Sequence, residues 1–413
     1  MVVSYNWLKE YLHIDLDAQK VGEILTSIGL EVEHISEKKQ IAGSLDQVVV
    51  AYVLECEEHP NSDHLHVTMV DAGEAEPIQI VCGAPNVAKG QKVLLAKVGA
   101  KLTTIGGDEI KIKRSKIRGV ESFGMICAED ELGIGVSHDG IMVLEDDAVV
   151  GTPAEEYLQL ESDTIFEIGL TPNRVDAASH LGVARDLYAY LKLNNITATL
   201  TLPSVEDFQE GEGEAIPIEV QDVEGSPRYI GITISDVTVG QSPQWLQDKL
   251  IAIGMRPINS VVDITNFVLH ETGQPLHAFD AAKIKGRKVV IRRAEDNTPF
   301  VTLDGIERKL TDKDLMICNT EEPMCIAGVF GGLDSGVTEE TKEIFLECAY
   351  FNPVTVRKTA KRFALSTDSS FRFERGTDPH ALPYVSILLA LLIQDLTVGK
   401  ITGKIQESYP EEV

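Results

Sequence analysis

The sequence predicts a multidomain α+β protein in which a small β-barrel interrupts a small α/β module and a larger α+β domain follows. Short apolar runs separated by turn residues extend from residue 46 to about 140 without a long helix. Helical periodicity precedes and follows this stretch. An acidic, polar linker then separates the second helical part from the larger domain that follows. A chain of 413 residues is long enough for about two to four domains with separate cores.

The small α/β module is predicted in two parts, residues 1–39 and 152–200. In the first part, apolar residues on one face predict a helix over 18–28, with Asp17 as N-cap and Gly29 as its end. A strand over 30–35 should follow. In the second part, a turn at 171–174 precedes a helix near 179–191.

The inserted barrel is predicted to occupy residues 40–151. Its alternating runs are strands expected over 48–56, 65–71, 78–81, 92–97 and 124–127. About five short strands without long helices are typical of a small closed or partly open barrel.

The larger domain is predicted over residues 216–396, after a linker at 201–215. Strands are expected over 216–220 and 229–237, followed by an amphipathic helix that contains Trp245 and ends at Gly254. The remaining segment, residues 397–413, is too short to fold alone. We therefore expect it to begin a further, truncated domain.

The formal net charge of −28 is the main argument against nucleic-acid binding, because such binding requires cations placed against phosphates. Two dense cationic segments, residues 111–118 and 357–362, nevertheless interrupt the acidic chain. Either segment is also consistent with an ordinary solvated surface. Charge alone leaves both interpretations open.

Targeting and cysteine patterns favour a cytoplasmic protein. The amino terminus lacks a signal-peptide pattern, and no apolar run approaches the roughly 18–20 residues of a membrane span. The six cysteines are widely spread, and none forms a CxxC pair. We therefore expect reduced core thiols and no metal site.

Familiar catalytic signatures are missing from the sequence, including HExxH, GxSxG and a Walker loop. The glycines at 328, 331 and 332 permit close approach of the backbone to a ligand, or form a structural turn. His277 is either a polar site residue or a satisfied structural histidine. Glu347 lies in an apolar strand, where a buried carboxylate requires a hydrogen-bond partner.

Two sets of motifs carry a family resemblance. The first resembles the tRNA-binding OB domain of several synthetase-associated proteins and comprises HPNSDHL at 59–65, IVCGAPNV at 80–87, RGVESFGMIC at 118–127 and ELGI at 131–134. The second resembles the editing domain of the phenylalanine–tRNA ligase β-subunit family and comprises NSVVDITN at 259–266, GQPLHAFD at 273–280 and TDSSFRFERG at 367–376. The strings LTPNRVD at 170–176 and SHLGVARDL at 179–187 resemble the small module that the OB domain interrupts in this family.

The resemblance covers essentially the whole chain and implies the amino-terminal half of a β subunit. It implies tRNA binding and hydrolysis of mischarged Tyr-tRNA(Phe), with no catalytic residue assigned. The editing-pocket positions it carries over are His277, Glu347, Thr265, Asn266, Gly331, Thr367 and Ser369. Ser369 departs from the family, in which alanine is frequent at this position. RNA contacts are expected from the cations of the basic segment, namely Lys111, Lys113, Arg114, Lys116 and Arg118.

The resemblance also implies partners and cofactors. The expected partners are tRNA(Phe) and a separate α subunit that performs aminoacylation, in a family heterotetramer of two α and two β subunits, with no DNA or membrane partner. No cofactor is expected in this chain, whereas the complete enzyme would use ATP and Mg²⁺. The alternative is a non-catalytic tRNA-binding or structural half-subunit with a vestigial editing pocket.

Overall fold

The computed structural model describes residues 1–39, 43–104, 107–135, 137–158, 160 and 162–412. The chain divides into two compact units, one formed by Met1–Ser36 with Thr164–Val413 and the other by Glu37–Asp163. The predicted start of the barrel domain, at residue 40, lies outside the described residues, as does the predicted end of the last segment at Val413.

The amino-terminal part of the first unit is a small α/β module. A three-stranded sheet has the order β1, β14, β3, where β1 is Val2–Ser4, β14 is Ser162–Gly169 and β3 is Glu31–Lys39. Its helices are α1 (Tyr5–Tyr11), α2 (Ala18–Ser27) and α4 (His180–Leu193), with a 3-10 turn at Val175–Ala177. The short strands β2 (Leu12–His13) and β15 (Thr199–Leu200) pair with each other.

Two helices of this module begin where the sequence predicts. The Asp17 carboxylate accepts a hydrogen bond from the Lys20 N–H, and the Ser179 hydroxyl accepts one from the Gly182 N–H. Each side chain thereby satisfies an amide at the first turn that has no partner within the helix.

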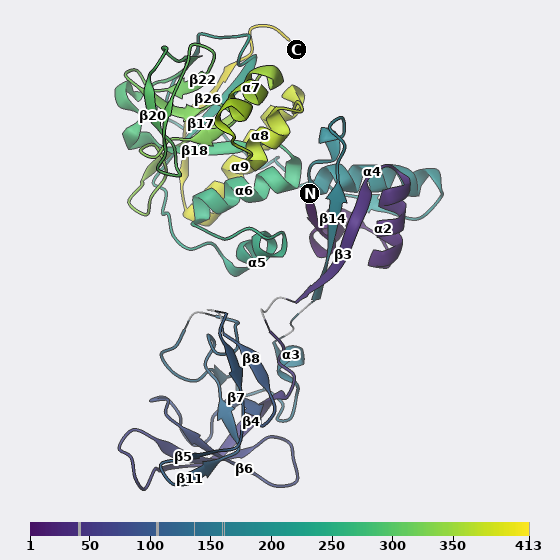
Figure 1. Cartoon of the computed structure of the whole chain (residues 1–413), viewed down its shortest axis with the longest axis vertical. Helices are drawn as coiled ribbons and strands as arrows, with labels where there is room; N and C mark the ends of the chain where they lie inside the picture. The colour runs from purple at the N-terminus through teal and green to yellow at the C-terminus, as the bar shows by residue number, and fades with distance from the viewer. Residues whose placement is uncertain (40–42, 105–106, 136, 159, 161, 413) are drawn as a thin grey trace. The chain divides into compact units, whose positions relative to one another are not determined.

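The larger part of the first unit is built around an antiparallel four-stranded sheet. Its order is β18 (Leu276–Asp280), β25 (Glu343–Tyr350), β17 (Arg228–Ser235) and β26 (Lys400–Ser408). Alternate residues Ile230, Ile232 and Ile234 pack in the core shared with the helices α5 (Gln244–Ala252), α6 (Ser260–Thr272) and α9 (Leu382–Thr397). Figure 1 shows α6 and α9 on one side of strands β17 and β18.

A second sheet covers the other face. Its order is β16 (Ile218–Val220), β19 (Val289–Arg293), β22 (Leu315–Cys318), β23 (Pro323–Ile326) and β24 (Phe330–Gly331). Tyr229, Phe279 and Phe345, which alternate with the residues facing the helices, enter the core beneath this second sheet. The remaining elements of the unit are β20 (Pro299–Val301), β21 (Glu307–Lys309), α7 (Pro353–Phe363), α8 (Asp368–Phe373) and 3-10 turns at Ala281–Lys283, Lys285–Arg287 and Pro379–Ala381.

The end of the chain differs from the prediction. Within the predicted last segment, residues 400–408 belong to the central sheet of the larger domain, because strand β26 pairs with β17 from Tyr229↔Ser408 to Ser235↔Lys400. Strand β17 would otherwise be an edge strand with unpaired amides, and β26 satisfies them.

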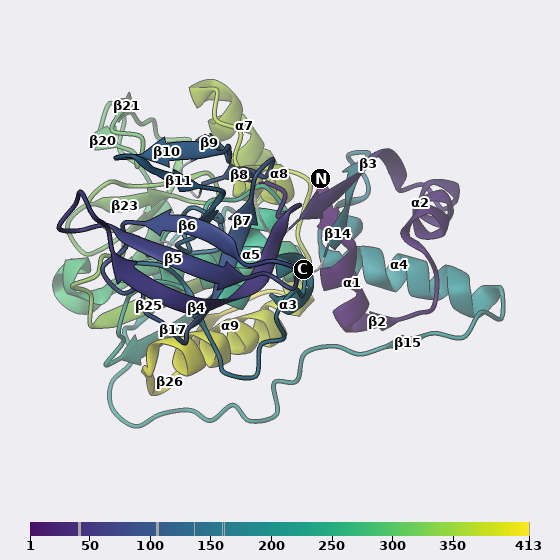
Figure 2. The same ribbon diagram turned by 90° about the horizontal axis from the view of Figure 1, so that it is seen from below.

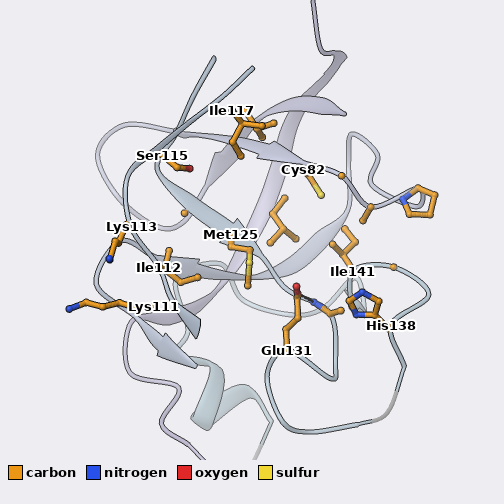
Figure 3. A pocket seen from close by; sticks show the side chains of 18 residues that line it. Cys82, Lys111, Ile112, Lys113, Ser115, Ile117, Met125, Glu131, His138 and Ile141 are labelled. Carbon is orange, nitrogen blue, oxygen red and sulfur yellow. Dashed lines mark hydrogen bonds between the residues drawn. The ribbon is translucent and has the colours of Figure 1, made fainter. Parts of the chain in front are cut away.

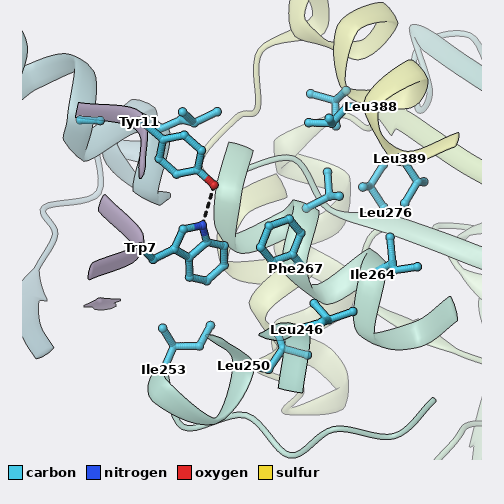
Figure 4. Close-up of a cluster of buried hydrophobic side chains, with 14 of the residues drawn as sticks. Trp7, Tyr11, Leu246, Leu250, Ile253, Ile264, Phe267, Leu276, Leu388 and Leu389 are labelled. Atoms are coloured by element: carbon cyan, nitrogen blue, oxygen red, sulfur yellow. Dashed lines mark hydrogen bonds between the residues drawn. The ribbon is translucent and has the colours of Figure 1, made fainter. Parts of the chain in front are cut away.

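The small module and the larger domain share one apolar core, where the sequence predicts separate cores. Trp7 from α1 stacks on Phe267 from α6, with ring centroids 4.8 Å apart and planes 6° apart. Figure 4 shows these rings beside Tyr11 and the leucines of α5 and α9. Large aromatic rings contribute to stability mainly when they are buried, and here each part of the unit buries the rings of the other. The small module and the larger domain therefore form one packed unit.

One segment, Pro379–Thr397, is long and apolar enough to cross a membrane by length and composition alone. No apolar run of this length was expected from the sequence. Here α9, which forms most of it, packs against the central sheet through buried residues such as Leu389 and Ile393.

The second unit is a nearly closed β-barrel. Its sheet has the order β12 (Gly124–Ile126), β7 (Lys92–Lys97), β4 (Val48–Glu58), β5 (His66–Asp71) and β6 (Ile78–Cys82), and β13 (Val143–Leu144) also pairs with β7. The Phe123 N–H donates to Gln79 O over 3.0 Å, which joins the first strand of the order to the last. Figure 2 shows β4, β5 and β6 side by side.

All five predicted barrel strands are present in this sheet, with ends that differ by no more than two residues. Two hairpins and a helix complete the unit: β8 (Lys101–Thr103) with β9 (Glu109–Lys111), β10 (Ser115–Ile117) with β11 (Val120–Ser122), and α3 (Ala154–Tyr157). The six cysteines of the chain are free thiols, and all except Cys56 are buried, as expected.

Candidate functional site

The two polar residues singled out in the larger domain lie directly opposite each other. In the register of the central sheet, His277 of β18 pairs with Glu347 of β25, and Glu347 pairs in turn with Gly231 of β17. Directly opposite residues point to the same face of a sheet. This face is the one covered by the second sheet, where Tyr229 and Phe345 also lie.

Glu347 is a buried carboxyl group with one neutral partner. The Tyr229 hydroxyl donates to its Oε2 over 3.3 Å. Burial raises the pKa of Glu347 to about 8, and the hydrogen bond from Tyr229 opposes this rise. At neutral pH the carboxyl group is therefore mainly protonated and can donate as well as accept a hydrogen bond.

His277 presents a nitrogen without a partner. Its side chain is half-buried, and its buried Nε2 has no hydrogen-bond partner. The ring stands edge to face against Phe279, with centroids 4.5 Å apart. Burial lowers the pKa of His277 to about 4, so the imidazole is neutral at pH 7 and has one donor and one acceptor nitrogen.

The backbone at Gly331 lies close to the His277 ring. A Cβ atom at Gly331 would lie 3.3 Å from Cε1 of His277 and 2.9 Å from Cδ1 of Leu303, so a larger residue would push on both. The turn before it is held by Thr367, whose hydroxyl donates to Val329 O over 3.0 Å. Thr367 also caps α8 through a reciprocal capping box with Ser370.

Three of the predicted pocket residues lie apart from this group. Thr265 and Asn266 belong to α6, which packs on the opposite face of the central sheet, and the Thr265 hydroxyl donates to Val262 O within its own helix. Ser369 is a partly buried residue of α8. Among the described residues, no hydrogen bond joins these three side chains to His277 or Glu347.

Two residues that shape the site, Tyr229 and Gly231, were not predicted from the sequence. A Cβ atom at Gly231 would lie 2.4 Å from Cζ of Phe345, so only glycine lets that ring cross β17 beside Glu347. The alternation of Tyr229 and Gly231 along one strand is visible in the sequence. Their position beside Glu347 depends on the register between β17 and β25, which the sequence does not reveal.

A cavity of about 240 Å³ opens next to this region, lined among others by Phe300, Met324, Gly332 and Ser335. His277 and Glu347 do not line it. Within the described part of the chain, no three histidine, cysteine, aspartate or glutamate side chains are grouped to hold a metal ion.

The basic segment of the barrel borders a groove of that unit. A cavity of about 650 Å³ is lined by Lys111 and Lys113 as well as by apolar residues such as Ile112 and Met125. Figure 3 shows the two lysines on one rim and Glu131 and His138 on the other. Such a groove presents cations beside an apolar floor, which suits the phosphates and bases of an unpaired strand.

The other predicted cations of this segment are exposed but partly engaged. Arg114 pairs with Glu121 over 2.6 Å and lies over the Phe123 ring. Arg118 donates to Asn61 O over 3.3 Å, while Lys116 is exposed on β10. The two lysines of the groove and Lys116 are therefore the cations best placed to meet phosphates.

The comparisons with known proteins agree with this two-part organisation. The family model of a putative tRNA binding domain matches residues 48–153, and that of the B3/4 domain matches residues 225–398. The chain is thus a protein of the class that combines an OB-like tRNA-binding domain with a B3/4 domain.

Curated relatives place it more narrowly. The chain is 58% identical to the phenylalanine–tRNA ligase beta subunit of Bacteroides fragilis over 409 residues, which are 98% of this chain and 50% of the relative. It is 57% identical to that of Porphyromonas gingivalis over 404 residues, 98% of this chain and 49% of the relative. The chain belongs to the phenylalanine–tRNA ligase beta-subunit family, and it spans about half the length of the curated relatives it matches.

Among solved structures, the chain is similar to an amino-terminal fragment of the phenylalanyl-tRNA synthetase beta-subunit from Pyrococcus horikoshii. The identity is 16% and the TM-score 0.27, over 49% of this chain and 62% of that one.

Proposed function

We propose that this chain binds tRNA through its barrel and hydrolyses tyrosine wrongly attached to tRNA(Phe) in its B3/4 domain. Membership of the beta-subunit family supports the assignment. The observation that carries the hydrolytic part is the cross-strand pair of Glu347, which is buried, and His277, which is half-buried and has a buried Nε2 without a partner. Buried polar groups without partners are unfavourable unless a ligand supplies the missing hydrogen bonds.

The need for such a site follows from amino-acid chemistry. A pocket built for the phenylalanine ring rejects the same ring with one added hydroxyl by only about 100-fold. Tyrosine is therefore attached by mistake at a measurable rate. A second site that hydrogen-bonds the phenol selects tyrosine, because phenylalanine would leave its buried polar groups unpaired at about 1–3 kcal/mol each.

Glu347 and His277 have the chemistry for that selection. The phenol hydroxyl both donates and accepts, and it would meet the Glu347 carboxyl group and the neutral His277 ring at one end of the pocket. Gly331 leaves room beside the imidazole. Thr265, Asn266, Thr367 and Ser369 are proposed to line more distant parts of the substrate path.

The bond cleavage itself is assigned to a positioned water molecule. Among the predicted site residues there is no serine or cysteine hydrogen-bonded to a histidine base. His277 and Glu347 therefore recognise the substrate, and a terminal ribose hydroxyl of the tRNA is proposed to help orient the attacking water.

The remaining parts of the proposal concern the complete enzyme. We assign aminoacylation, with its ATP and Mg²⁺, to a separate α subunit in a heterotetramer of two α and two β subunits located in the cytoplasm. The alternative function is a tRNA-binding or structural half-subunit with a vestigial pocket.

Hydrolysis of purified Tyr-tRNA(Phe) and Phe-tRNA(Phe) by the full enzyme separates the two functions. Preferential hydrolysis of Tyr-tRNA(Phe), lost with Glu347→Ala while Phe-tRNA formation persists, is the expected result. Equal hydrolysis rates with and without the enzyme, for both charged tRNAs, would favour the vestigial pocket.

A further inference from the structure

Helix α7 presents a cluster of positive charge in the larger domain. Its buried side consists of Val356, Thr359 and Ala360. Arg357, Lys358, Lys361 and Arg362 are all exposed, and the helix contains no acidic residue. Since residues four apart lie about 6 Å apart along a helix, Arg357 with Lys361 and Lys358 with Arg362 form two short rows of cations.

Only one of these four cations is held by a carboxylate. Arg362 pairs with the buried Asp314, which also accepts a hydrogen bond from Thr359 over 2.8 Å. In the part of the chain that the structure describes, no ion pair involves Arg357, Lys358 or Lys361. Three free cations are notable in a chain with 65 acidic and 37 basic residues, because such a chain offers many carboxylates to neutralise them.

A groove follows the same helix. A cavity of about 770 Å³ is lined by Thr355, Lys358 and Arg362 of α7 and by Arg293, Lys313 and Asn352 from neighbouring segments. Four carboxylates, Glu224, Asp296, Asp312 and Asp314, also line it and balance its four cations, so the unneutralised positive charge lies on the exposed side of α7 and not on the groove floor. Arg293 is already paired with Asp222 and anchored to Lys313 O. The lysines beside this groove can contact phosphates, and its carboxylates can accept hydrogen bonds from ribose hydroxyls.

The end of α7 reaches the candidate site through one hairpin. Phe363 O, at the last residue of the helix, accepts a hydrogen bond from Arg308 of β21 over 3.5 Å. The same hairpin carries Leu303, which lies against Gly331, and Gly331 lies against His277. The basic face and the proposed hydrolytic site are therefore neighbours in one folded unit.

We propose that the cationic face of α7, defined by Arg357, Lys358 and Lys361, binds the sugar–phosphate backbone of the tRNA whose charged end enters the His277 and Glu347 site. The inference rests on the proposed function. It deepens that function by assigning an RNA path on the B3/4 domain itself, separate from the barrel. An RNA fits better than an acidic protein, because the centres of protein–protein interfaces are depleted in charge and rich in aromatic residues, whereas the only large apolar side chain exposed on α7 is Val354.

The test removes two of the free lysines, Lys358→Gln with Lys361→Gln, in the full-length protein together with its partner subunit. The matched control is Lys342→Gln with Lys404→Gln, which removes the same charge from two exposed lysines of the same unit. Binding of uncharged tRNA(Phe) is measured by fluorescence anisotropy across a series of salt concentrations, after thermal melts have established equal stability.

In the α7 variant, the slope of log K against log salt concentration should become shallower by about 1.4 to 1.8. Each phosphate contact contributes about 0.7 to 0.9 to this slope. The KM for hydrolysis of Tyr-tRNA(Phe) should rise with little change in kcat, whereas the control should match the wild type. A salt dependence equal to that of the control would overturn the proposal. So would intact tRNA binding with a loss of subunit association, which would identify a protein partner. The binding measurement needs no hydrolysis, so the two proposals can fail separately. An enzyme that binds tRNA as expected but leaves Tyr-tRNA(Phe) intact would refute the proposed function, whereas the proposal that α7 binds RNA would stand.

Discussion

The Tyr11 hydroxyl donates to Glu271 Oε1 over 2.5 Å, although the two residues are 260 positions apart in the sequence. Tyr11 also accepts a 2.5 Å hydrogen bond from the Trp7 indole nitrogen. This chain of hydrogen bonds joins α1 of the small module to α6 of the larger domain inside their common core. The other carboxyl oxygen of Glu271 is buried without a partner, which disfavours the charged form of this group.

Replacement of Tyr11 by phenylalanine should destabilise this unit by about 2–3 kcal/mol, because it leaves both the Trp7 N–H and the Glu271 carboxyl group unpaired. Chemical denaturation followed by tryptophan fluorescence measures the change. Tyr5→Phe, which removes a hydroxyl that donates to Leu16 O, is a control for loss of a single tyrosine hydroxyl. Equal effects of the two substitutions would contradict the proposed link.

The Glu271 carboxyl group should make stability depend on pH. Burial raises the pKa of Glu271 from 4.5 to about 7, while the hydrogen bond from Tyr11 and the charge of Lys249 oppose the rise. The folded state therefore holds this proton more tightly than the unfolded state. Its stabilising contribution is complete below pH 4.5 and is lost as pH rises to about 7. The free energy of unfolding of the wild type minus that of Glu271→Gln should fall on the order of 3 kcal/mol across this range. A difference that stays constant with pH would exclude the raised pKa.

At pH 8.5, where the carboxyl group of Glu347 is mainly ionised, Glu347→Ala should lower the preference for Tyr-tRNA(Phe) over Phe-tRNA(Phe) by roughly 10- to 150-fold, the range for loss of a hydrogen bond to a charged group worth about 1.5–3 kcal/mol. Because the pKa of Glu347 lies near 8, the wild-type carboxyl group becomes a charged acceptor as pH rises through this value. The wild-type preference should therefore increase from pH 7 to 8.5, and that of Glu347→Gln should not. Hydrolysis of both charged tRNAs, corrected for spontaneous deacylation, decides the matter. Undiminished selectivity in Glu347→Ala would eliminate this residue as the recogniser.

Gly331→Ala should slow hydrolysis of Tyr-tRNA(Phe) while changing stability little, because the added methyl group meets His277 and the flexible end of Leu303. We expect a loss of at least about 10-fold in kcat/KM, equivalent to about 1.4 kcal/mol. Gly336→Ala is the control, since a Cβ atom there would have no neighbour within 4 Å. Similar activities of the two variants would argue against close contact of substrate with this turn.

Alanine at Lys113, Arg114 and Lys116 should weaken RNA binding by the barrel across sequences and flatten its salt dependence. The two lysines should account for a slope change of about 1.4 to 1.8, with a smaller share from Arg114, because Glu121 already pairs with it. Titration of the full enzyme with tRNA at several salt concentrations measures this. An unchanged slope would show that the basic segment is an ordinary solvated surface that does not contact RNA.

This chain alone should form no Phe-tRNA from phenylalanine, ATP and tRNA, because aminoacylation is assigned to the α subunit. Incorporation of radiolabelled phenylalanine is the measurement, with the complete enzyme as the positive control. Phe-tRNA formed above background by the chain alone would contradict the assignment of aminoacylation to the α subunit.

Local sequence patterns determined much of the secondary structure. Alternating apolar residues and turn signals predicted the five barrel strands, and Asp17 marked the start of α2, because side-chain alternation and amide capping act between residues close in sequence. The apolar neighbours of Glu347 marked it as a carboxylate that needs a partner, whereas the family resemblance placed His277 in the same pocket.

Tertiary structure alone decided how these pieces meet. The register of β17, β18 and β25 sets His277, Glu347 and Gly231 in one row, and a shift of one residue would turn each side chain to the other face. The pairing of β26 with β17 and the hydrogen bond between Tyr11 and Glu271 join segments more than 160 residues apart. Such contacts depend on which surfaces can be buried together, and periodicity within one segment contains no information about its distant partner.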